Sequence, residues 1–308
     1  MKKLIIAGGS GFLGAVITDA FKDTFDDIVL LSRLPAGRQE SSIKNNIRTV
    51  IWDATSLGQW ATELEGSNVV INMTGRSVDC RYTKKNKDII LRSRVESTHI
   101  LGKAITQCKN PPKIWFNSST ATIYRHSLDK EMDEETGEIG QGFSVQVAKA
   151  WEEAFFSHHT PNTRKVALRT SIVLGKNGGA LRPMITMTKL GLGGKQGSGN
   201  QKFSWIHEED FVRIIQFIMD DTTIEGPINV VAPIPSDNKT LMRILRTSLK
   251  IPLGLAAPRP LLEVGAFLIR TETELLLKSR NVVPKKLINK GFKHIYSNLE
   301  HAIKDLTS

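Results

Sequence analysis

The chain has little cysteine, few aromatic residues and no long apolar run. Its 308 residues include only two cysteines, Cys80 and Cys108, whose spacing fits neither a disulfide framework nor a zinc site. Such scarcity is typical of a reducing compartment, so the sequence predicts a cytoplasmic protein. No run approaches the roughly 20 apolar residues that a helix needs to span a bilayer, which argues against a membrane protein. A hydrophobic share of 40% is typical of a globular chain.

Acidic residues are outnumbered by basic ones. The 42 Lys and Arg residues against 31 Asp and Glu give a formal net charge of +11, which attracts anionic partners. The tail is especially basic, with charges at Lys278, Arg280, Lys285, Lys286, Lys290 and Lys293. It carries no helix-turn-helix, zinc or RNP pattern, so we expect a solvated basic face and no nucleic-acid binding. The expected partner is a small molecule, anionic or phosphate-bearing.

Short apolar runs alternate with amphipathic stretches in the first half of the chain. The runs at residues 4–7, 28–31, 48–51, 69–72 and 114–117 predict strands. Between them, residues 12–21 and 88–106 show the periodicity of helices. Parallel strands that are covered on both faces have such near-continuous apolar runs. The pattern therefore predicts an α/β fold, a Rossmann-type doubly wound parallel sheet with a smaller C-terminal lobe.

The second half is less regular. Strands are expected at residues 166–174, 203–206 and 228–231, and helices at 211–218, at 240–249 and in the tail from residue 258. Asp210 is the expected N-cap of the first of these helices. The glycine-rich stretch from Gly191 to Gly199 predicts an exposed loop near a site. We expect a Rossmann domain at residues 1–175, to which residues 205–232 return, and a small domain at residues 176–308.

A glycine-rich turn follows the first predicted strand and opens the first predicted helix. Glycine allows a tight turn, close approach of a pyrophosphate to the backbone, and packing of the helix against the strand. The free N–H groups and the helix dipole then attract phosphates. A plain strand-to-helix turn is the alternative. The sequence predicts a dinucleotide site formed by Gly8, Ser10, Gly11, Phe12, Leu13 and Gly14.

The ends of the next strands predict which dinucleotide binds. The second strand ends at Arg33 with no carboxylate, and a guanidinium suits the 2′-phosphate of NADP(H) better than the 2′-hydroxyl of NAD(H). We therefore predict NADP(H), with a solvated surface arginine as the alternative. Asp53 is expected either to accept a hydrogen bond from the adenine amino group or to stabilise a turn. Thr74 and Gly75 follow the fourth strand and allow the cofactor to approach closely.

Three motifs in order resemble the extended short-chain dehydrogenase/reductase superfamily: the glycine turn, Asn117-Ser-Ser-Thr-Ala-Thr-Ile-Tyr124 and Trp205-Ile-His-Glu-Glu-Asp210. Residues 93–98, 150–152, 226–233 and 282–292 are similar to an atypical branch, labelled nucleoside-diphosphate-sugar epimerases, whose members end in a small domain of uncharacterised function. The resemblance spans nearly the whole chain. It implies hydride transfer between a nicotinamide and a carbonyl or carbinol carbon.

The resemblance also implies a catalytic set. Family members use a Ser or Thr after the fifth strand and a Tyr-x-x-x-Lys motif on the next helix, where the lysine lowers the pKa of the phenol. Thr120 and Lys149 fall on the first and last positions, but Val145 stands where the tyrosine belongs. Tyr124 is the nearest replacement acid, with a packing role as the alternative. Thr120 could instead end its strand by bonding backbone groups, and Lys149 could be an exposed helix lysine.

Two functions remain open. One is an NADP-dependent oxidoreductase or epimerase-like enzyme with a carbonyl or hydroxyl substrate, for which a nucleotide sugar is one candidate. The other is a non-catalytic NADPH-binding regulatory or redox-sensing protein, because valine cannot transfer a proton. Arg94 is expected either to meet a cofactor phosphate or an anionic substrate, or to form a surface ion pair with Glu96 or another neighbour. Arg76, Arg81 and Arg169 are expected to form an electropositive mouth, with ordinary solvated charge as the alternative. No metal is expected, and the resemblance allows a homodimer.

Overall fold

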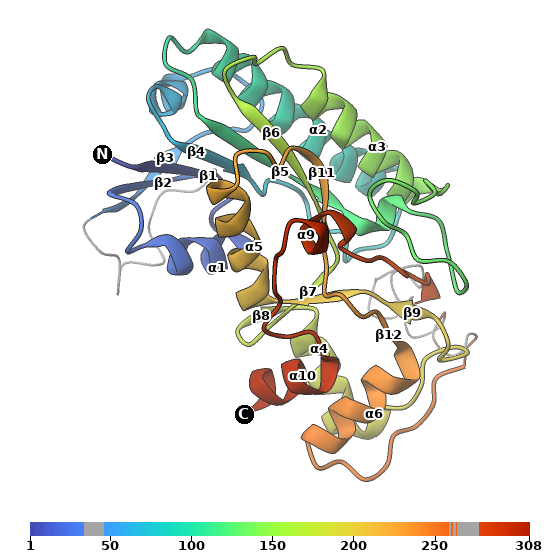
Figure 1. The fold of residues 1–308 in the computed structure, drawn as a ribbon. Coiled ribbons are helices and arrows are strands. Elements are labelled where there is room, and N and C mark those ends of the chain that lie inside the picture. Colours follow the sequence, from blue (N-terminus) through green and yellow to red (C-terminus); the bar gives the residue numbers. More distant parts are fainter. Residues whose placement is uncertain (34–45, 259, 261–262, 264–276) are drawn as a thin grey trace.

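A computed structural model describes residues 1–33, 46–258, 260, 263 and 277–308 (Figure 1). Its centre is a seven-stranded sheet in the order β11-β6-β5-β4-β1-β2-β3, and every neighbouring pair is parallel. The order reverses beside β1, which confirms the predicted doubly wound α/β fold. The strands are β1 (Lys3–Ala7), β2 (Asp27–Ser32), β3 (Ile47–Ile51), β4 (Val69–Asn72), β5 (Ile114–Thr120), β6 (Arg164–Thr170) and β11 (Gly226–Val230).

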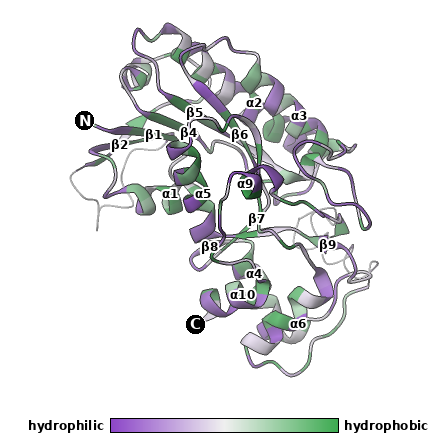
Figure 2. Cartoon of the chain, viewed as in Figure 1, coloured by the Kyte–Doolittle hydropathy of each residue, from purple (hydrophilic) through white to green (hydrophobic). Residues whose placement is uncertain are grey.

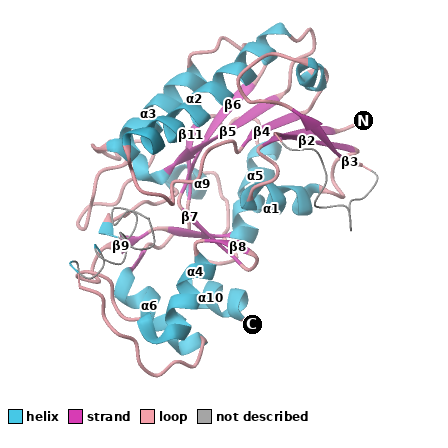
Figure 3. Ribbon diagram, turned by 180° about the vertical axis from the view of Figure 1, so that it is seen from behind, coloured by secondary structure: helices cyan, strands magenta, loops and turns pink. Residues whose placement is uncertain are grey.

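Alternate side chains of the central strands enter two separate cores. Leu4 and Ile6 of β1 pack with α1 (Phe12–Phe21) and α5 (Glu208–Asp220) on one face. The neighbouring Ile5 packs on the other face, in the core that also takes side chains from α2 (Lys84–Gln107) and α3 (Phe143–Phe156). Figure 3 shows α2 and α3 side by side, away from α1 and α5. This double coverage explains why the strands read as almost continuous apolar runs.

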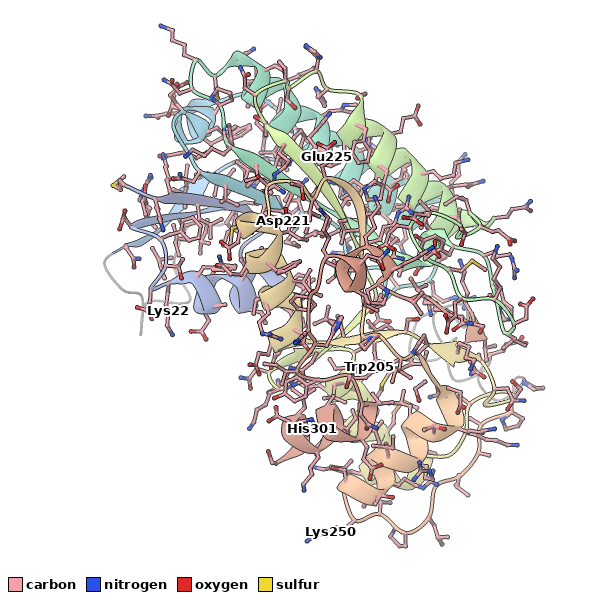
Figure 4. The ribbon with its side chains drawn as sticks, in the orientation of Figure 1. Lys22, Trp205, Asp221, Glu225, Lys250 and His301 are labelled. Atoms are coloured by element: carbon pink, nitrogen blue, oxygen red, sulfur yellow. The ribbon has the colours of Figure 1, made fainter. Side chains whose placement is uncertain are left out.

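A smaller lobe lies beyond the carboxyl ends of the central strands (Figure 1). Two small sheets belong to it: β7 (Ile172–Gly175) with β8 (Gly178–Gly179) and β10 (Trp205–His207), and β9 (Lys202–Phe203) with β12 (Ser236–Asp237). Its helices are α4 (Leu181–Met187), η3 (Thr188–Leu192), α6 (Asn238–Ser248) and α10 (Leu299–Thr307). Figure 2 shows hydrophobic and hydrophilic residues alternating along α6. Apolar side chains of α6 and α10 share a third core with Trp205. Figure 4 shows Trp205 where the lobe meets the main sheet, with His301 and Lys250 farther out.

Two expected strands are interrupted. The run at residues 166–174 breaks at Ser171, because β6 ends in the central sheet and β7 pairs with β10 instead. The run at 203–206 breaks at Ser204, whose hydroxyl donates to the carbonyl of Arg280 and accepts from the N–H of Val282. The short helices η1 (Gln59–Leu64) and η2 (Ala121–Ile123) have no counterpart among the expected elements. In the tail, α9 (Lys285–Asn289) and α10 are helical, as expected, and residues 259, 261–262 and 264–276 lie outside the described residues.

Two local expectations are wrong. The N-cap of α5 is His207, whose Nδ1 accepts from the N–H of Glu209 at 3.1 Å, while the carboxylate of Asp210 is taken by the N–H groups of Ile295 and Tyr296. The stretch from 191 to 199 is no open loop. Its backbone groups form hydrogen bonds with residues 255–257, and Gly194 has no room for a Cβ. No helix in the described part of the chain is long and apolar enough to cross a membrane.

Candidate functional site

A cavity of about 360 Å³ opens at the carboxyl ends of three central strands. Residues 73–75 after β4, residues 118–120 at the end of β5, and Thr170 with Ser171 at the end of β6 line its floor. Leu13 at the start of α1 joins it to the glycine turn. Ligands of doubly wound sheets bind at this edge, beside the point where the strand order reverses. The site therefore lies where the fold places ligands.

Two glycines of the turn beside this cavity, Gly8 and Gly14, have no room for a side chain. Gly8 has a φ of +81°, and a Cβ there would lie 2.9 Å from the carbonyl carbon of Met73. A Cβ on Gly14 would lie 2.6 Å from the Cα of Gly9. The N-cap of α1 is Gly11, which offers no side-chain acceptor to the first N–H groups of the helix. Those N–H groups are then available to an anion.

The predicted cofactor residues separate into two groups. Leu13, Thr74 and Gly75 line the cavity, together with Thr120 and Arg94. Ser10, Gly11 and Phe12 line a different hollow, a groove of about 720 Å³ beside α5. The ring of Phe12 packs against the backbone of the β7–β8 hairpin, whose glycines leave it space. The structure thus brings the middle of the turn to this groove and Leu13 to the cavity, while Gly8 and Gly14 line neither.

The two residues expected around the adenosine follow β2 and β3, the strands on the other side of β1 from the cavity. Arg33 is exposed directly after β2. Asp53 follows β3 and accepts hydrogen bonds from the Ser56 hydroxyl and from the N–H groups of Ser56 and Thr55, the latter two at 2.8 Å each. These bonds, that of the Ser56 hydroxyl foremost, hold the pKa of Asp53 well below its usual range. The structure shows the turn contacts of Asp53, the second of its two expected roles.

Helix α3 faces the cavity with a different set of residues from the one the resemblance assigns. Its lining residues are Phe143, Ser144, Val147 and Trp151. Lys149 is exposed and Val145 is buried, and neither lines the cavity. Two residues along an α-helix rotate a side chain by about 200°, so the pair 145/149 points away when 147/151 points in. Val147 and Trp151 are the cavity-facing positions four residues apart.

A buried polar chain fixes Trp151 beneath the cavity. Its indole Nε1 donates to the hydroxyl of Thr98 at 3.0 Å, and that hydroxyl donates to Oδ1 of Asn117 at 3.2 Å. Asn72 donates to the same oxygen at 2.7 Å and accepts from the N–H of Thr74 at 3.0 Å. The chain ties β4, β5, α2 and α3 together, so it sets the shape of the cavity wall.

Arg94 reaches the cavity from α2. Its guanidinium carbon lies 5.0 Å from the ring centroid of Trp151, and Nη1 donates to the carbonyls of Arg76 and Ile90 at 2.9 and 3.0 Å. It packs so closely on Gly75 that a Cβ there would lie 3.0 Å from it. Burial lowers the pKa of Arg94 to about 10. No carboxylate among the described residues acts on the pKa of Arg94, so the cavity holds a partly desolvated cation.

Tyr124 and Arg169 belong to a buried network behind the cavity. The Tyr124 hydroxyl donates to Oδ1 of Asn229 at 3.0 Å and accepts from Nη1 of Arg169 at 2.9 Å. Arg169 forms a two-pronged pair with Glu152 at 2.8 and 2.7 Å, and Ser119 donates to the same carboxylate. Burial raises the pKa of Tyr124. This placement fits a packing role for Tyr124, and Arg169 is no part of an open mouth.

Thr120 ends β5 and has both expected features. It lines the cavity, and its Oγ1 accepts from the N–H of Thr122 at 3.1 Å, which caps the short helix η2. The hydroxyl hydrogen is not used in that bond. Thr120 can therefore donate to a ligand oxygen while its lone pair holds the turn.

Two tail cations were expected in a solvated face, and that expectation is wrong. Lys278 and Arg280 are each 9% exposed. Nζ of Lys278 donates to the carbonyl of Thr122 at 2.9 Å, and Nε of Arg280 donates to the hydroxyl of Thr122 at 3.1 Å. Both line a second, small cavity of about 30 Å³ in the lobe. Since Thr122 also lines the first cavity, the tail supplies positive charge beside the site. The composition of the tail predicts its positive charge but not which of its charged side chains are buried.

The described residues hold no cluster of His, Cys, Asp and Glu suited to a metal ion. The model of the NAD dependent epimerase/dehydratase family matches residues 4–231, and that of a domain of unknown function, DUF1731, matches residues 257–306. Epimerase family protein SDR39U1 of Mus musculus is 29% identical over 313 residues, covering 99% of this chain and all of the relative. Epimerase family protein YfhF of Bacillus subtilis is 31% identical over 303 residues, covering 98% and 97%. The crystal structure of human SDR39U1 (isoform 2) with NADPH superposes with a TM-score of 0.84 at 27% identity, covering 99% of both chains.

Proposed function

The chain belongs to the NAD dependent epimerase/dehydratase family, and from that premise we propose that it is an NADP-dependent oxidoreductase or epimerase-like enzyme acting on a carbonyl or hydroxyl group. The observation that carries this proposal is the cavity at the carboxyl ends of β4, β5 and β6, beside a turn in which Gly8 and Gly14 have no room for a Cβ. The NADPH in the human SDR39U1 structure supports the choice of cofactor.

The residues present fit a nicotinamide dinucleotide. The first N–H groups of α1 would hold the pyrophosphate, and the cavity between Thr74 and Thr120 would take the nicotinamide end. Arg33 would meet the 2′-phosphate at the end of β2. When bound, the cofactor supplies a hydride. Thr120 would donate a hydrogen bond to the oxygen that is reduced, which orients the carbonyl carbon toward the cofactor.

Cofactor preference is tested by calorimetric titration of the full chain with NADPH and with NADH. We expect NADPH to bind more tightly, and Arg33→Ala to reduce the preference about tenfold or more, because a charge-assisted hydrogen bond contributes roughly 1.5–3 kcal/mol. The matched control is Arg92→Ala, an arginine on α2 whose side chain is 63% exposed and pairs with Glu96. Equal affinity of the wild type for both cofactors, or an unchanged ratio in Arg33→Ala, would defeat the assignment.

We further propose that the substrate is anionic or phosphate-bearing, with a nucleotide sugar as one candidate. Lys278 and Arg280 support this, since their charges lie against Thr122 at the rim of the cavity. Titration with uridine diphosphate as the probe should give binding that Arg280→Met weakens at least tenfold. Lys293→Met, at an exposed position in the same tail, is the control. Binding that survives Arg280→Met in a folded variant would remove this part of the proposal.

A non-catalytic NADPH-binding regulator or redox sensor is the second candidate. Helix α3 favours it, because the residues by which it lines the cavity, Phe143, Ser144, Val147 and Trp151, include no tyrosine to donate a proton to a substrate. The decision comes from NADPH absorbance at saturating cofactor with a panel of carbonyl compounds and nucleotide sugars. Turnover supports the enzyme, whereas tight NADPH binding without turnover across the panel supports the sensor.

A further inference from the structure

We propose that Tyr82 is the proton donor of this site and that Arg94 is the cation that stabilises its phenolate. The inference rests on the proposed function and deepens it. It moves the acid from helix α3, where the family resemblance places it, to the connection between β4 and α2.

Tyr82 is the one tyrosine of three that the structure places at the cavity. Tyr124 is 2% exposed and its hydroxyl lies between Asn229 and Arg169, behind the cavity wall. Tyr296 is stacked on His207 in the C-terminal lobe, with ring centroids 3.7 Å apart. Tyr82 is partly buried and lies edge-on against Phe143, with ring centroids 5.0 Å apart. Phe143 thereby fixes the ring at the wall where α3 begins.

No other described lining residue can exchange a proton near neutral pH. The cavity is lined by aliphatic and aromatic side chains, by Gly75, and by the hydroxyls of several Ser and Thr residues, which are far weaker acids than a phenol. Among the described residues that line it, Tyr82 and Arg94 are the only titratable ones, and a guanidinium keeps its proton. The task of general acid therefore falls to Tyr82.

Arg94 is placed to support that role. Tyr82 and Arg94 interact electrostatically, so that the ionised phenol favours the guanidinium and, reciprocally, the guanidinium favours the ionised phenol. The cation is held by Trp151, by Gly75 and by two backbone carbonyls, so it cannot swing away. A second cation, Nζ of Lys87, lies 5.3 Å from the ring of Phe143. The cavity-lining start of α3, Phe143 and Ser144, brings no charge.

In the direction of reduction, the carbonyl group takes a hydride on carbon and a proton on oxygen. The carbonyl carbon gains the hydride of NADPH, the π pair of the C=O bond moves to oxygen, and that oxygen takes the proton of the Tyr82 hydroxyl. NADPH and the carbonyl leave as NADP⁺ and the alcohol. The phenolate beside Arg94 regains its proton from solvent, which reaches Tyr82 because the residue is only partly buried. Thr120 donates to the same oxygen throughout.

The first test needs no substrate. Tyrosinate absorbance near 295 nm is followed against pH in the full chain. Burial raises the pKa of Tyr124 and raises that of Tyr296 to about 12, so we expect the first ionisation step to belong to Tyr82. Tyr82→Phe should remove this first step and Tyr124→Phe should keep it. Arg94→Met should move it to higher pH, and Arg94→Lys should restore it in part.

A first step that persists in Tyr82→Phe, or that Arg94→Met leaves in place, overturns the inference. The kinetic test uses any carbonyl that the wild type reduces with NADPH. Tyr82→Phe should lower kcat about 100-fold or more, whereas Tyr124→Phe should change it little. A kcat that survives Tyr82→Phe also overturns the inference. NADPH affinity, titrated in parallel, separates the two proposals: wild type that fails to bind NADPH defeats the proposed function, while intact binding with unaltered kcat in Tyr82→Phe defeats only the role of Tyr82.

Discussion

At the scale of single residues, the pair of Arg169 and Glu152 shows how much the site depends on what lies behind it. The two side chains are only 10% and 12% exposed, and Ser119 and Tyr124 complete their hydrogen bonds. Removing one partner leaves a buried charge without its counter-ion. The network thus holds the end of β5, where Thr120 lies, against α3 and β6.

We predict that Glu152→Gln destabilises the protein by about 3–5 kcal/mol, the usual cost of leaving one member of a buried ion pair uncompensated. Urea unfolding followed by circular dichroism measures it. The control is Glu138→Gln, which removes the exposed partner of Arg125 and should change the unfolding midpoint little. A Glu152→Gln midpoint equal to that of the control would contradict the buried-pair account.

Residues whose role depends on local backbone were predictable, and those whose role depends on a helix face were not. Gly8 and Gly14 could be predicted because a tight strand-to-helix turn excludes a Cβ wherever it occurs. Trp151 could not, because a shift of two positions reverses the side of α3 that meets the cavity. Tyr82 lies in a connection without periodicity. Its only signal was its place shortly after the fourth predicted strand.

At the scale of elements, a glycine of the turn between β1 and α1 can be compared with a glycine elsewhere that has a similar backbone conformation. Gly8 and Gly66 both have positive φ, +81° and +68°. A Cβ on Gly8 would collide with the backbone after β4, whereas nothing lies within 4 Å of a Cβ on Gly66. The two positions separate the effect of backbone strain from the effect of close approach.

We predict that Gly8→Ala and Gly66→Ala each lose roughly 1–2 kcal/mol to the left-handed backbone. Gly8→Ala should lose more, because residues 73 and 74 must shift, and its NADPH affinity should fall at least tenfold. Urea unfolding and calorimetry measure the two effects. NADPH affinity in Gly8→Ala equal to that in Gly66→Ala would show that the turn does not seat the cofactor.

The elements also show where pattern reading ends. Apolar runs located the central strands, because α1 and α5 cover one face of the sheet and α2 and α3 cover the other; only β3, at the edge, has no fully buried residue. The same runs could not reveal that the chain leaves the central sheet at Ser171, since β7 is as apolar as β6. Asp210 is a better N-cap by residue type than His207, but tertiary bonds to the tail take its carboxylate.

At the scale of the whole molecule, the match of the family model to residues 4–231 confirms the resemblance drawn from the glycine turn and the later motifs. The lobe is joined to the Rossmann part by buried polar groups. His207 is one of them: it caps α5, stacks on Tyr296, and its Nε2 lies 3.3 Å from Asp305 of α10. Burial lowers the pKa of His207, against the opposing effect of Asp305.

This predicts a loss of stability in mild acid. Because the pKa of His207 is lower in the folded chain than its unfolded value of about 6.5, the unfolded chain takes up the proton first as the pH falls. The contribution is full above about pH 6.5 and is lost as the pH falls through the folded pKa. Urea midpoints between pH 7.5 and 5.5 should decline less in His207→Asn, which keeps a capping oxygen, than in wild type or in the exposed-site control His159→Asn. Equal declines in all three would contradict the prediction.

The central claim is that the cavity at the ends of β4, β5 and β6 receives the nicotinamide of a dinucleotide seated on the glycine turn. A crystal structure of the full chain with NADPH tests it most directly. We expect the pyrophosphate on the first N–H groups of α1 and the nicotinamide between Thr74 and Thr120, within reach of Tyr82. Cofactor bound away from the glycine turn, or a cavity that stays empty at saturating NADPH, would contradict the account.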